Sequence, residues 1–286
     1  MKTICMSEKK VYEYSSLVKL DSKYFAIPSS IIKNIDLNEK RVTVFSYFSK
    51  CRDLDNEVLF SINHIAKWMG KQPNRTANGI NNKIIQIIQC LIDEGYLTLS
   101  EEFNVSSYID AVFNLSVVQS RCDIERFAII YLDELKKILN CKNDAFANND
   151  ILLLVFAYLR MKIHRRKNDL LPEEINIDKK NDHEYDICKR RLESPDAYDC
   201  YYCEIAKDLG ISARIVSKAV SILNELGLIY SESLPRIKYG NKWKTDHTIF
   251  CNTYKREGSN LLACGEDYYL TEVENKKKKL NIVDNR

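Results

Sequence analysis

The chain has 286 residues, a formal net charge of +3 and 45 % hydrophobic residues, which is the composition of a folded protein of about two domains and excludes a disordered one. Only 8 glycines are present, and neither G-x-G-x-x-G nor G-x-x-x-x-G-K-[ST] occurs, so the phosphate-cradling loops of Rossmann and P-loop enzymes are excluded. No apolar run reaches the ~18 residues of a membrane span, and no signal-peptide pattern occurs, so we expect a cytoplasmic protein without membrane contact.

Four short motifs occur twice in the same order, which predicts an internal duplication. They are 25–27 and 127–129, 45–48 and 156–159, 65–70 and 205–210, and 91–97 and 223–229. The copies are offset by 102, 111, 140 and 132 residues, respectively. We therefore predict one domain over residues 1–120 and a second over residues 121–258, followed by a tail over 259–286 that is compatible with a short helix.

The changing offsets locate the insertions. The offset rises by 29 before the third motif, which places a charged, solvated insertion at about 165–196 in the second copy. It then falls by 8, which places eight additional residues within 71–79 of the first copy.

The second copy shows the clearer order of elements. A short amphipathic helix is expected over 204–212, with a turn at Gly210 and with Ser212 as the N-cap of a second helix over 213–226. Gly227 ends that helix, and a strand at 228–230, a basic loop at 236–244 and a strand at 248–254 follow. Helix, turn, helix and a hairpin with a basic tip is the order of a winged helix.

The first copy repeats this outline with a longer turn. A helix is expected within 61–70, then a long turn, a helix over 84–94 ended by Gly95, and a strand at 96–99. The predicted fold class is mainly α with small β-hairpins (α+β), arranged as two tandem winged-helix domains.

These residues carry a resemblance to known families. The segment Ile205-Ala-Lys-Asp-Leu-Gly-Ile-Ser212, with Val216, Val220, Leu223 and Gly227 after it, resembles the winged helix-turn-helix core of many bacterial DNA-binding proteins. The leader Tyr24-Phe-Ala-Ile-Pro28, followed by 37–47, resembles the opening of RepA-type plasmid replication initiators of low-GC Gram-positive bacteria and of their mobile elements. The resemblance covers most of residues 20–256, although the long first turn and the insertion depart from a compact winged helix. It implies non-enzymatic, sequence-specific binding of double-stranded DNA.

In a winged helix the second helix enters the major groove and the hairpin tip contacts the backbone. The segment 210–256 has eight basic and three acidic residues, a net charge of +5 that suits a phosphate-facing surface. The DNA-binding candidates of this copy are Ser212, Arg214, Ser217, Lys218, Ser221 and Asn224 on the helix and Arg236, Lys238, Lys242, Trp243 and Lys244 on the wing.

The first copy differs in charge, because residues 70–118 have three basic and five acidic residues, and its wing at 100–111 is acidic. One interpretation makes this copy a dimerisation module. The other keeps DNA contact, because Asn and Gln amides bond adenine edges. We favour the second, with most of the affinity coming from the second copy. The candidates are Lys71, Gln72, Asn74, Arg75, Asn78, Asn81, Asn82 and Lys83.

Two other functions remain possible interpretations of the sequence. A transcriptional regulator would use the same surfaces, and a protein-interaction module of a replication or conjugation complex would bind without the steep salt dependence of DNA. We expect a homodimer, with host replication proteins as further partners. Cys200-Tyr-Tyr-Cys203 has no second C-x-x-C and the four histidines are isolated, so no metal, cofactor or catalytic residue is predicted.

Overall fold

The computed structural model describes residues 24–52, 57–99, 113–117, 126–143, 148–163, 197–233, 237–239, 242–244 and 248–252. Four predicted features lie outside the described residues: the insertion at 165–196, the acidic wing at 100–111, Arg236 and the tail at 259–286.

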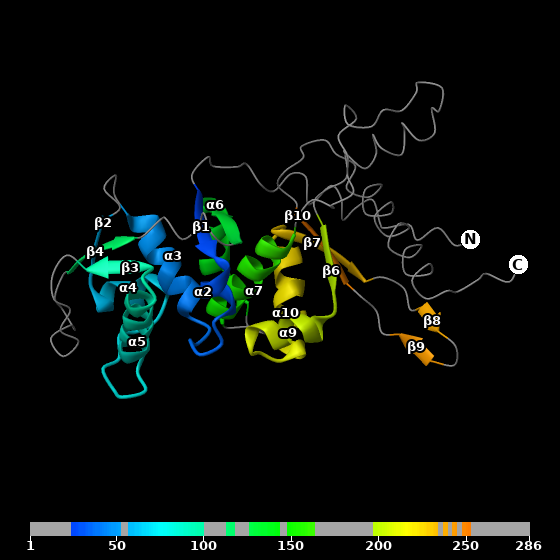
Figure 1. The fold of residues 1–286 in the computed structure, drawn as a ribbon, viewed down its shortest axis with the longest axis horizontal. Helices are drawn as coiled ribbons and strands as arrows, with labels where there is room; N and C mark the ends of the chain where they lie inside the picture. The colour runs from blue at the N-terminus through cyan, green and yellow to red at the C-terminus, as the bar shows by residue number, and fades with distance from the viewer. Residues whose placement is uncertain are drawn as a thin grey trace, which may run out of the picture. The chain divides into compact units, whose positions relative to one another are not determined.

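The described elements alternate between helices and short strands. The first part of the chain forms β1 (Tyr24–Pro28), α2 (Ser29–Lys33), α3 (Arg41–Cys51), β2 (Glu57–Phe60), α4 (Ile62–Trp68), α5 (Ile80–Asp93), β3 (Leu97–Leu99) and β4 (Phe113–Val117). The second part forms β5 (Phe127–Tyr131), α6 (Leu132–Leu139), α7 (Asn149–Lys162), β6 (Ala197–Cys200), α9 (Tyr202–Leu209), α10 (Ala213–Glu225), β7 (Ile229–Ser233), β8 (Ile237–Tyr239), β9 (Lys242–Lys244) and β10 (Thr248–Asn252). This mixture of helices and small antiparallel sheets agrees with the expected α+β class (Figure 1).

Among the described residues the two parts begin with the same order of elements, and the second part has the additional strands β8 and β9. We call β1 to β4 the first repeat and β5 to β10 the second repeat. Each begins with a strand, two helices, a strand and two further helices. The three-stranded sheets have the orders β2-β4-β3 and β6-β10-β7, so the last strand of each repeat lies in the middle of its sheet. The topology therefore agrees with the predicted duplication.

The first strands of the two repeats pair with each other. β1 and β5 are antiparallel, with Tyr24 opposite Tyr131 and Ala26 opposite Ile129. Phe25 is 2 % exposed whereas Phe127 is 42 % exposed, so the buried Phe25 corresponds to the buried Ala128. The structural offset is therefore one residue larger than the offset of 102 that the sequence motif predicted, and residues 26 and 129 are equivalent positions that face each other at the centre of the pair.

The core lies between the third elements of the repeats. Helix α3 packs against α7 and β1, and α7 packs against β5 and α6. Phe45 and Phe48 from α3 and Phe156 from α7 are buried, and each such side chain contributes ~1.5–3 kcal/mol by leaving water. The longest apolar run of the sequence, Ile151–Leu159, lies within α7 and is buried from Leu152 onward.

Each repeat docks its next helix through the same tyrosine of the repeated motif. In the first repeat the centre of the Tyr47 ring lies 5.4 Å from the centre of the Trp68 ring of α4. In the second repeat the Tyr158 hydroxyl donates to Asp208 Oδ2 of α9 over 2.7 Å. The motifs at 45–48 and 156–159 therefore correspond in contacts as well as in sequence.

Glycines close the first helix of each pair in the same way. The Lys71 amide donates to the Ala66 carbonyl over 2.9 Å, and the Ile211 amide donates to the Ala206 carbonyl over 3.0 Å. Between these donors and their acceptors lie Gly70 and Gly210, with φ of 71° and 68°. These helix ends match the predicted turns. Residues 69–79 connect α4 to α5 and residues 210–212 connect α9 to α10, so the two connections differ in length by the predicted eight residues.

Substituting these two glycines with alanine is expected to destabilise the protein unequally. Both variants place a Cβ in the left-handed region, at a cost of ~1–2 kcal/mol. At Gly70 the added Cβ meets nothing within 4 Å, whereas at Gly210 it lies 2.8 Å from Ile35 Cγ2. Urea unfolding should therefore give a lower stability for Gly210→Ala than for Gly70→Ala, and equal values would contradict the contact with Ile35.

Two predicted boundaries are wrong. Helix α5 begins at Ile80 rather than at residue 84, so three of the candidate polar residues lie in its first turn. The segment 236–244 was expected to be a loop, but β8 and β9 pair within it, with Lys238 opposite Trp243.

The chain divides into two compact units. One contains the described parts of Leu20–Lys162 together with Tyr202–Leu223, and the other contains those of Ile163–Tyr201 and Asn224–Arg286. The first repeat and the helix pair of the second repeat thus belong to one unit, into which α10 extends as far as Leu223. The predicted domain boundary at residue 120 stays a prediction. Within the part of the chain that the structure describes, no helix has the length and apolarity needed to cross a membrane.

Candidate nucleic-acid interface

Helix α10 presents a polar face opposite a buried stripe. Val216, Ala219, Val220 and Leu223 are buried at three- and four-residue spacing. Of the six residues predicted to contact DNA from this helix, Asn224 is half-buried and the other five are exposed: Ser212, Arg214, Ser217, Lys218 and Ser221. The hydrophobic pattern that forms the helix therefore also determines which side chains lie at its surface.

Two residues at the ends of this helix have structural contacts. Ser212 Oγ accepts the amide of Ile215 over 3.3 Å, which confirms the predicted N-cap. At the other end, Asn224 Nδ2 donates to Ser231 Oγ over 2.6 Å and Asn224 Oδ1 accepts the Ser231 amide over 2.9 Å. Asn224 therefore ties the end of α10 to β7, and we remove it from the candidates for base contact.

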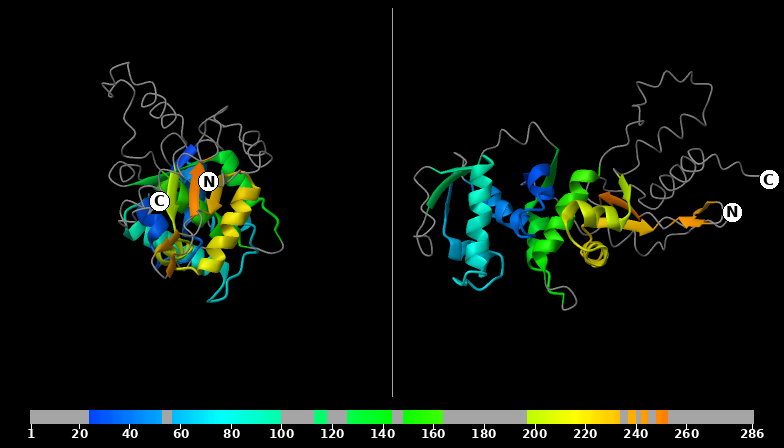
Figure 2. Two further views of the ribbon diagram at one scale, coloured as in Figure 1. Left: turned by 90° about the vertical axis from the view of Figure 1, so that its right-hand side faces the viewer. Right: turned by 60° about the horizontal axis from the view of Figure 1, so that its bottom comes forward.

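The first repeat carries the long turn, which we define as residues 71–79. In Figure 1 and in both views of Figure 2, this cyan segment extends beyond the ends of α4 and α5. Residues 74–78 are exposed, which includes the candidates Asn74, Arg75 and Asn78. The predicted contact residues at the start of the next helix, Asn82 and Lys83, are half-buried.

Asparagine side chains hold the long turn in shape. The buried Asn81 accepts the Asn74 amide at its Oδ1 over 3.0 Å and donates from Nδ2 to Asn63 Oδ1 over 2.9 Å. Asn82 Nδ2 donates to the carbonyls of Thr76 and Ala77 over 3.1 and 3.2 Å. These amides satisfy backbone groups of a turn that has no regular structure. They are structural side chains here, and the prediction that Asn81 and Asn82 read bases is weakened.

Gly79 closes this turn through a close approach of two backbone segments. Its amide donates to the Thr76 carbonyl over 2.7 Å. A Cβ at this position would lie 2.2 Å from the Asn74 carbonyl oxygen. Any residue with a Cβ would clash with this backbone, so the turn requires a glycine at position 79.

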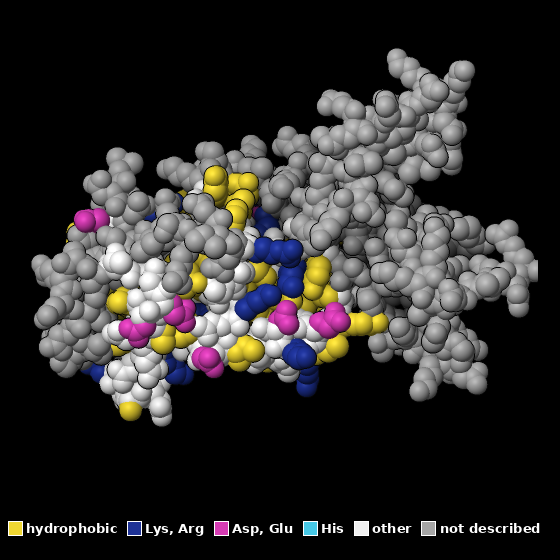
Figure 3. Space-filling view, viewed as in Figure 1, with side chains coloured by type: hydrophobic (Ala, Val, Ile, Leu, Met, Phe, Trp, Pro, Cys, Tyr) yellow, Lys and Arg dark blue, Asp and Glu magenta, His cyan; other side chains and the backbone are white. Residues whose placement is uncertain are grey.

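The charge of the first helix pair differs from that of its repeat as a whole. Residues 61–92 contain four basic residues and no acidic residue, because the carboxylates that gave the negative balance begin at Asp93. The basic residues are Lys67, Lys71, Arg75 and Lys83. On the face shown in Figure 3, basic and acidic side chains of the described residues lie among one another.

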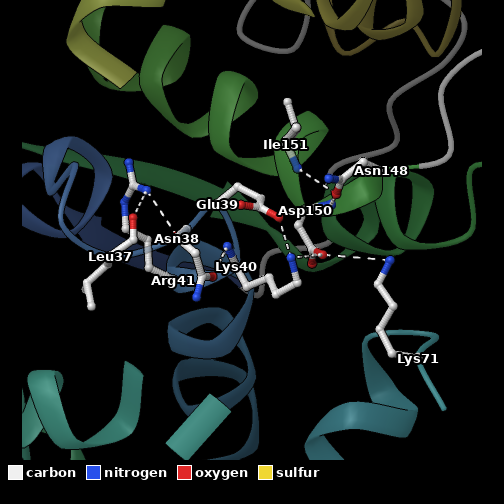
Figure 4. Close-up of polar contacts among 9 residues, drawn as sticks. All are labelled: Leu37, Asn38, Glu39, Lys40, Arg41, Lys71, Asn148, Asp150 and Ile151. Carbon is white, nitrogen blue, oxygen red and sulfur yellow. Dashed lines mark hydrogen bonds and ion pairs between the residues drawn. The ribbon is translucent and has the colours of Figure 1, made fainter. Parts of the chain in front are cut away.

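Lys71 points toward a buried carboxylate at the start of α7 (Figure 4). Its Nζ lies 3.9 Å from Asp150 Oδ2, and Lys40 Nζ lies at the same distance from that oxygen. Lys40 also pairs with Glu39. Burial raises the pKa of Asp150, although the two ammonium groups and Thr43 act in the opposite direction. Lys71 is thus a predicted DNA-contacting residue to which the structure gives an alternative ionic partner.

The wing of the second repeat is described in its backbone only. Lys238 lies in β8, and Lys242, Trp243 and Lys244 lie in β9. The strand pairing brings these residues together on one hairpin, as the prediction of a basic wing requires.

The two cysteines of the C-x-x-C pair lie in different elements. Cys200 ends β6 and is buried, whereas Cys203 lies in the first turn of α9 and is exposed. Among the described residues, no three His, Cys, Asp or Glu side chains gather as metal ligands. His64 of α4 lies with its ring 5.7 Å from the ring of Tyr47.

Sequence reasoning missed Asp150 and the two docking tyrosines. The tyrosines could have been found, because both lie in the repeated motif at 45–48 and 156–159. Asp150 gives no such signal, since its partner Lys71 lies far from it in sequence. No protein-family model and no curated protein matches this chain.

Proposed function

We propose that this protein is a non-enzymatic, sequence-specific double-stranded DNA-binding protein built from two tandem winged helices. The observation that carries the proposal is the exposed face of α10. Arg214 and Lys218 lie there four residues apart with three serines around them, opposite the buried stripe. A helix that follows a short turn and presents Arg, Lys and Ser in this way suits the major groove, where such side chains bond base edges and phosphates.

The first helix pair supports the same function. Residues 61–92 carry a charge of +4 from Lys and Arg, and the long turn exposes Arg75. Both helix pairs belong to the same compact unit, apart from the end of α10, and their turns lie toward the lower side of Figure 1. A single duplex could therefore contact both pairs.

We further propose that the role of the binding is to initiate replication of a plasmid or mobile element. The tandem arrangement and the resemblance of the leader to RepA-type initiators support this role over transcriptional regulation. On this proposal the protein acts in the cytoplasm as a homodimer, with host replication proteins as partners.

Selection of bound sequences from random duplexes tests the proposal. Enrichment of one motif is expected, with affinity that falls steeply between about 50 and 200 mM salt because counterions are released from the phosphates. Recovery of no motif would contradict sequence-specific binding. Binding of proteins without binding of any duplex would favour the interaction-module interpretation instead.

A further inference from the structure

We propose that Asp150 is a positioning residue, which from the start of α7 in the second repeat holds Lys71 and thereby the long turn of the first repeat in place for DNA binding. The inference rests on the proposed function. A buried carboxylate of the second repeat would thus position a segment of the first repeat that contacts DNA.

The geometry of the carboxylate supports this assignment. The Asp150 side chain is 3 % exposed, and the Lys71 side chain, which reaches it from the long turn, is 33 % exposed. Within the described part of the chain, Asp150 Oδ2 has no hydrogen-bond donor. The charge of this carboxylate is therefore compensated by Lys40 and Lys71, each at 3.9 Å from Oδ2, together with the Thr43 hydroxyl.

The second repeat shows why this contact concerns the long turn. The residue after the helix-ending glycine is Lys71 in the first repeat and Ile211 in the second. Ile211 cannot form an ion pair, and only three residues separate its two helices. The ionic contact thus occurs in the repeat whose turn is eight residues longer.

The contact also changes what Lys71 does toward DNA. A lysine that neutralises a phosphate contributes about 0.9 to the slope of log affinity against log salt. A lysine held by a carboxylate contributes through the position of its turn instead. Lys71→Met should therefore weaken duplex binding ~2- to 30-fold while the salt slope stays unchanged.

Stability separates positioning from a general structural role. Because burial raises the pKa of Asp150, ionisation of this group costs the folded state free energy. The charged groups that face it are Glu39 and Lys40 at the start of α3 and Lys71. The wild type should lose stability relative to Asp150→Asn as the pH rises from the ordinary aspartate pKa of 3.8 through the raised one. Asp150→Asn is thus expected to keep or raise the unfolding midpoint at neutral pH and yet bind DNA more weakly, whereas a structural residue would lose both.

The experiment compares Asp150→Asn, Lys71→Met, the double variant and Lys71→Arg as the conservative control. Amide hydrogen exchange over 71–79 is measured without DNA, and duplex affinity and its salt slope are measured with the selected sequence. Each single variant should speed exchange and weaken binding, the double variant should be no worse than either, and Lys71→Arg should behave as the wild type.

Three outcomes would overturn the proposal: unchanged exchange in both single variants, additive effects in the double variant, or a salt slope that falls by about 0.9 in Lys71→Met. If the wild type binds no duplex, the proposed function fails, while exchange and the double-variant comparison still decide whether Asp150 holds the turn. Lys71→Met keeps the test decisive if Asp150→Asn does not fold, because Lys71 is partly exposed.

Discussion

Replacing Arg214 and Lys218 together with alanine is expected to weaken binding to the selected duplex on the order of a hundredfold, since each lost contact to a base or phosphate costs ~1–3 kcal/mol. Both side chains are exposed on α10, so the fold should stay intact. The salt slope should fall by about 0.9 for each of the two residues that contacts a phosphate. Titration of a labelled duplex at several salt concentrations measures both quantities.

The matched control removes the same charge elsewhere. Lys136 on α6 and Lys142 after it are also exposed, and neither belongs to a helix pair. Lys136→Ala/Lys142→Ala should change affinity only slightly. If the α10 variant binds as the wild type while Arg75→Ala/Lys83→Ala abolishes binding, the first repeat supplies the affinity and the assignment is reversed.

Glu134→Ala is expected to cost the largest stability of any substitution considered, ~3–5 kcal/mol, because it breaks a buried ion pair by removing the carboxylate that pairs with Arg160. Glu134 Oε1 accepts Arg160 Nη2 over 2.5 Å, and the two side chains are 1 % and 2 % exposed. Glu134 Oε2 also accepts the Tyr131 amide over 2.9 Å at the start of α6. Urea unfolding of the full chain measures the loss.

A double variant distinguishes charge from packing. Glu134→Leu/Arg160→Met keeps the apolar volume and removes both charges, and it should recover most of the stability. If it is as unstable as Glu134→Ala, packing accounts for the loss. The Arg160 guanidinium carbon, which lies 4.7 Å from the centre of the Phe156 ring, would then be the contact to examine next.

The sequence predicted those parts of the fold that depend on neighbouring residues. Periodic apolar residues and a terminal glycine placed α9 within three residues and α10 within one residue of their bounds, because helix ends are decided by local backbone chemistry. The start of α5 was predicted too late, since Asn81 and Asn82 look like turn residues. Their amides in fact stabilise the turn from within the first turn of the helix.

Long-range contacts could not be predicted in the same way. The pairing of β1 with β5 joins residues about a hundred positions apart, and nothing local to either strand specifies its partner. The same holds for the candidate interface. The exposed face of α10 followed from its pattern, whereas the contact of Lys71 with Asp150 depends on how the two repeats pack, so Lys71 was expected to face phosphate alone.

The register of β1 and β5 is symmetric, as it is where equivalent strands of two subunits pair across a two-fold axis. Ala26 faces its own equivalent, Ile129, so these two strands pair as equivalent strands of a two-fold dimer would. The covalent connection removes the concentration dependence of such an association. It also removes the requirement that both halves be identical, and the halves have diverged: one has Lys71 and the long turn, and the other has Ile211 and a turn of three residues. A dyad with unlike halves can match a binding site that lacks two-fold symmetry, and a protein bound there has a defined orientation along the duplex.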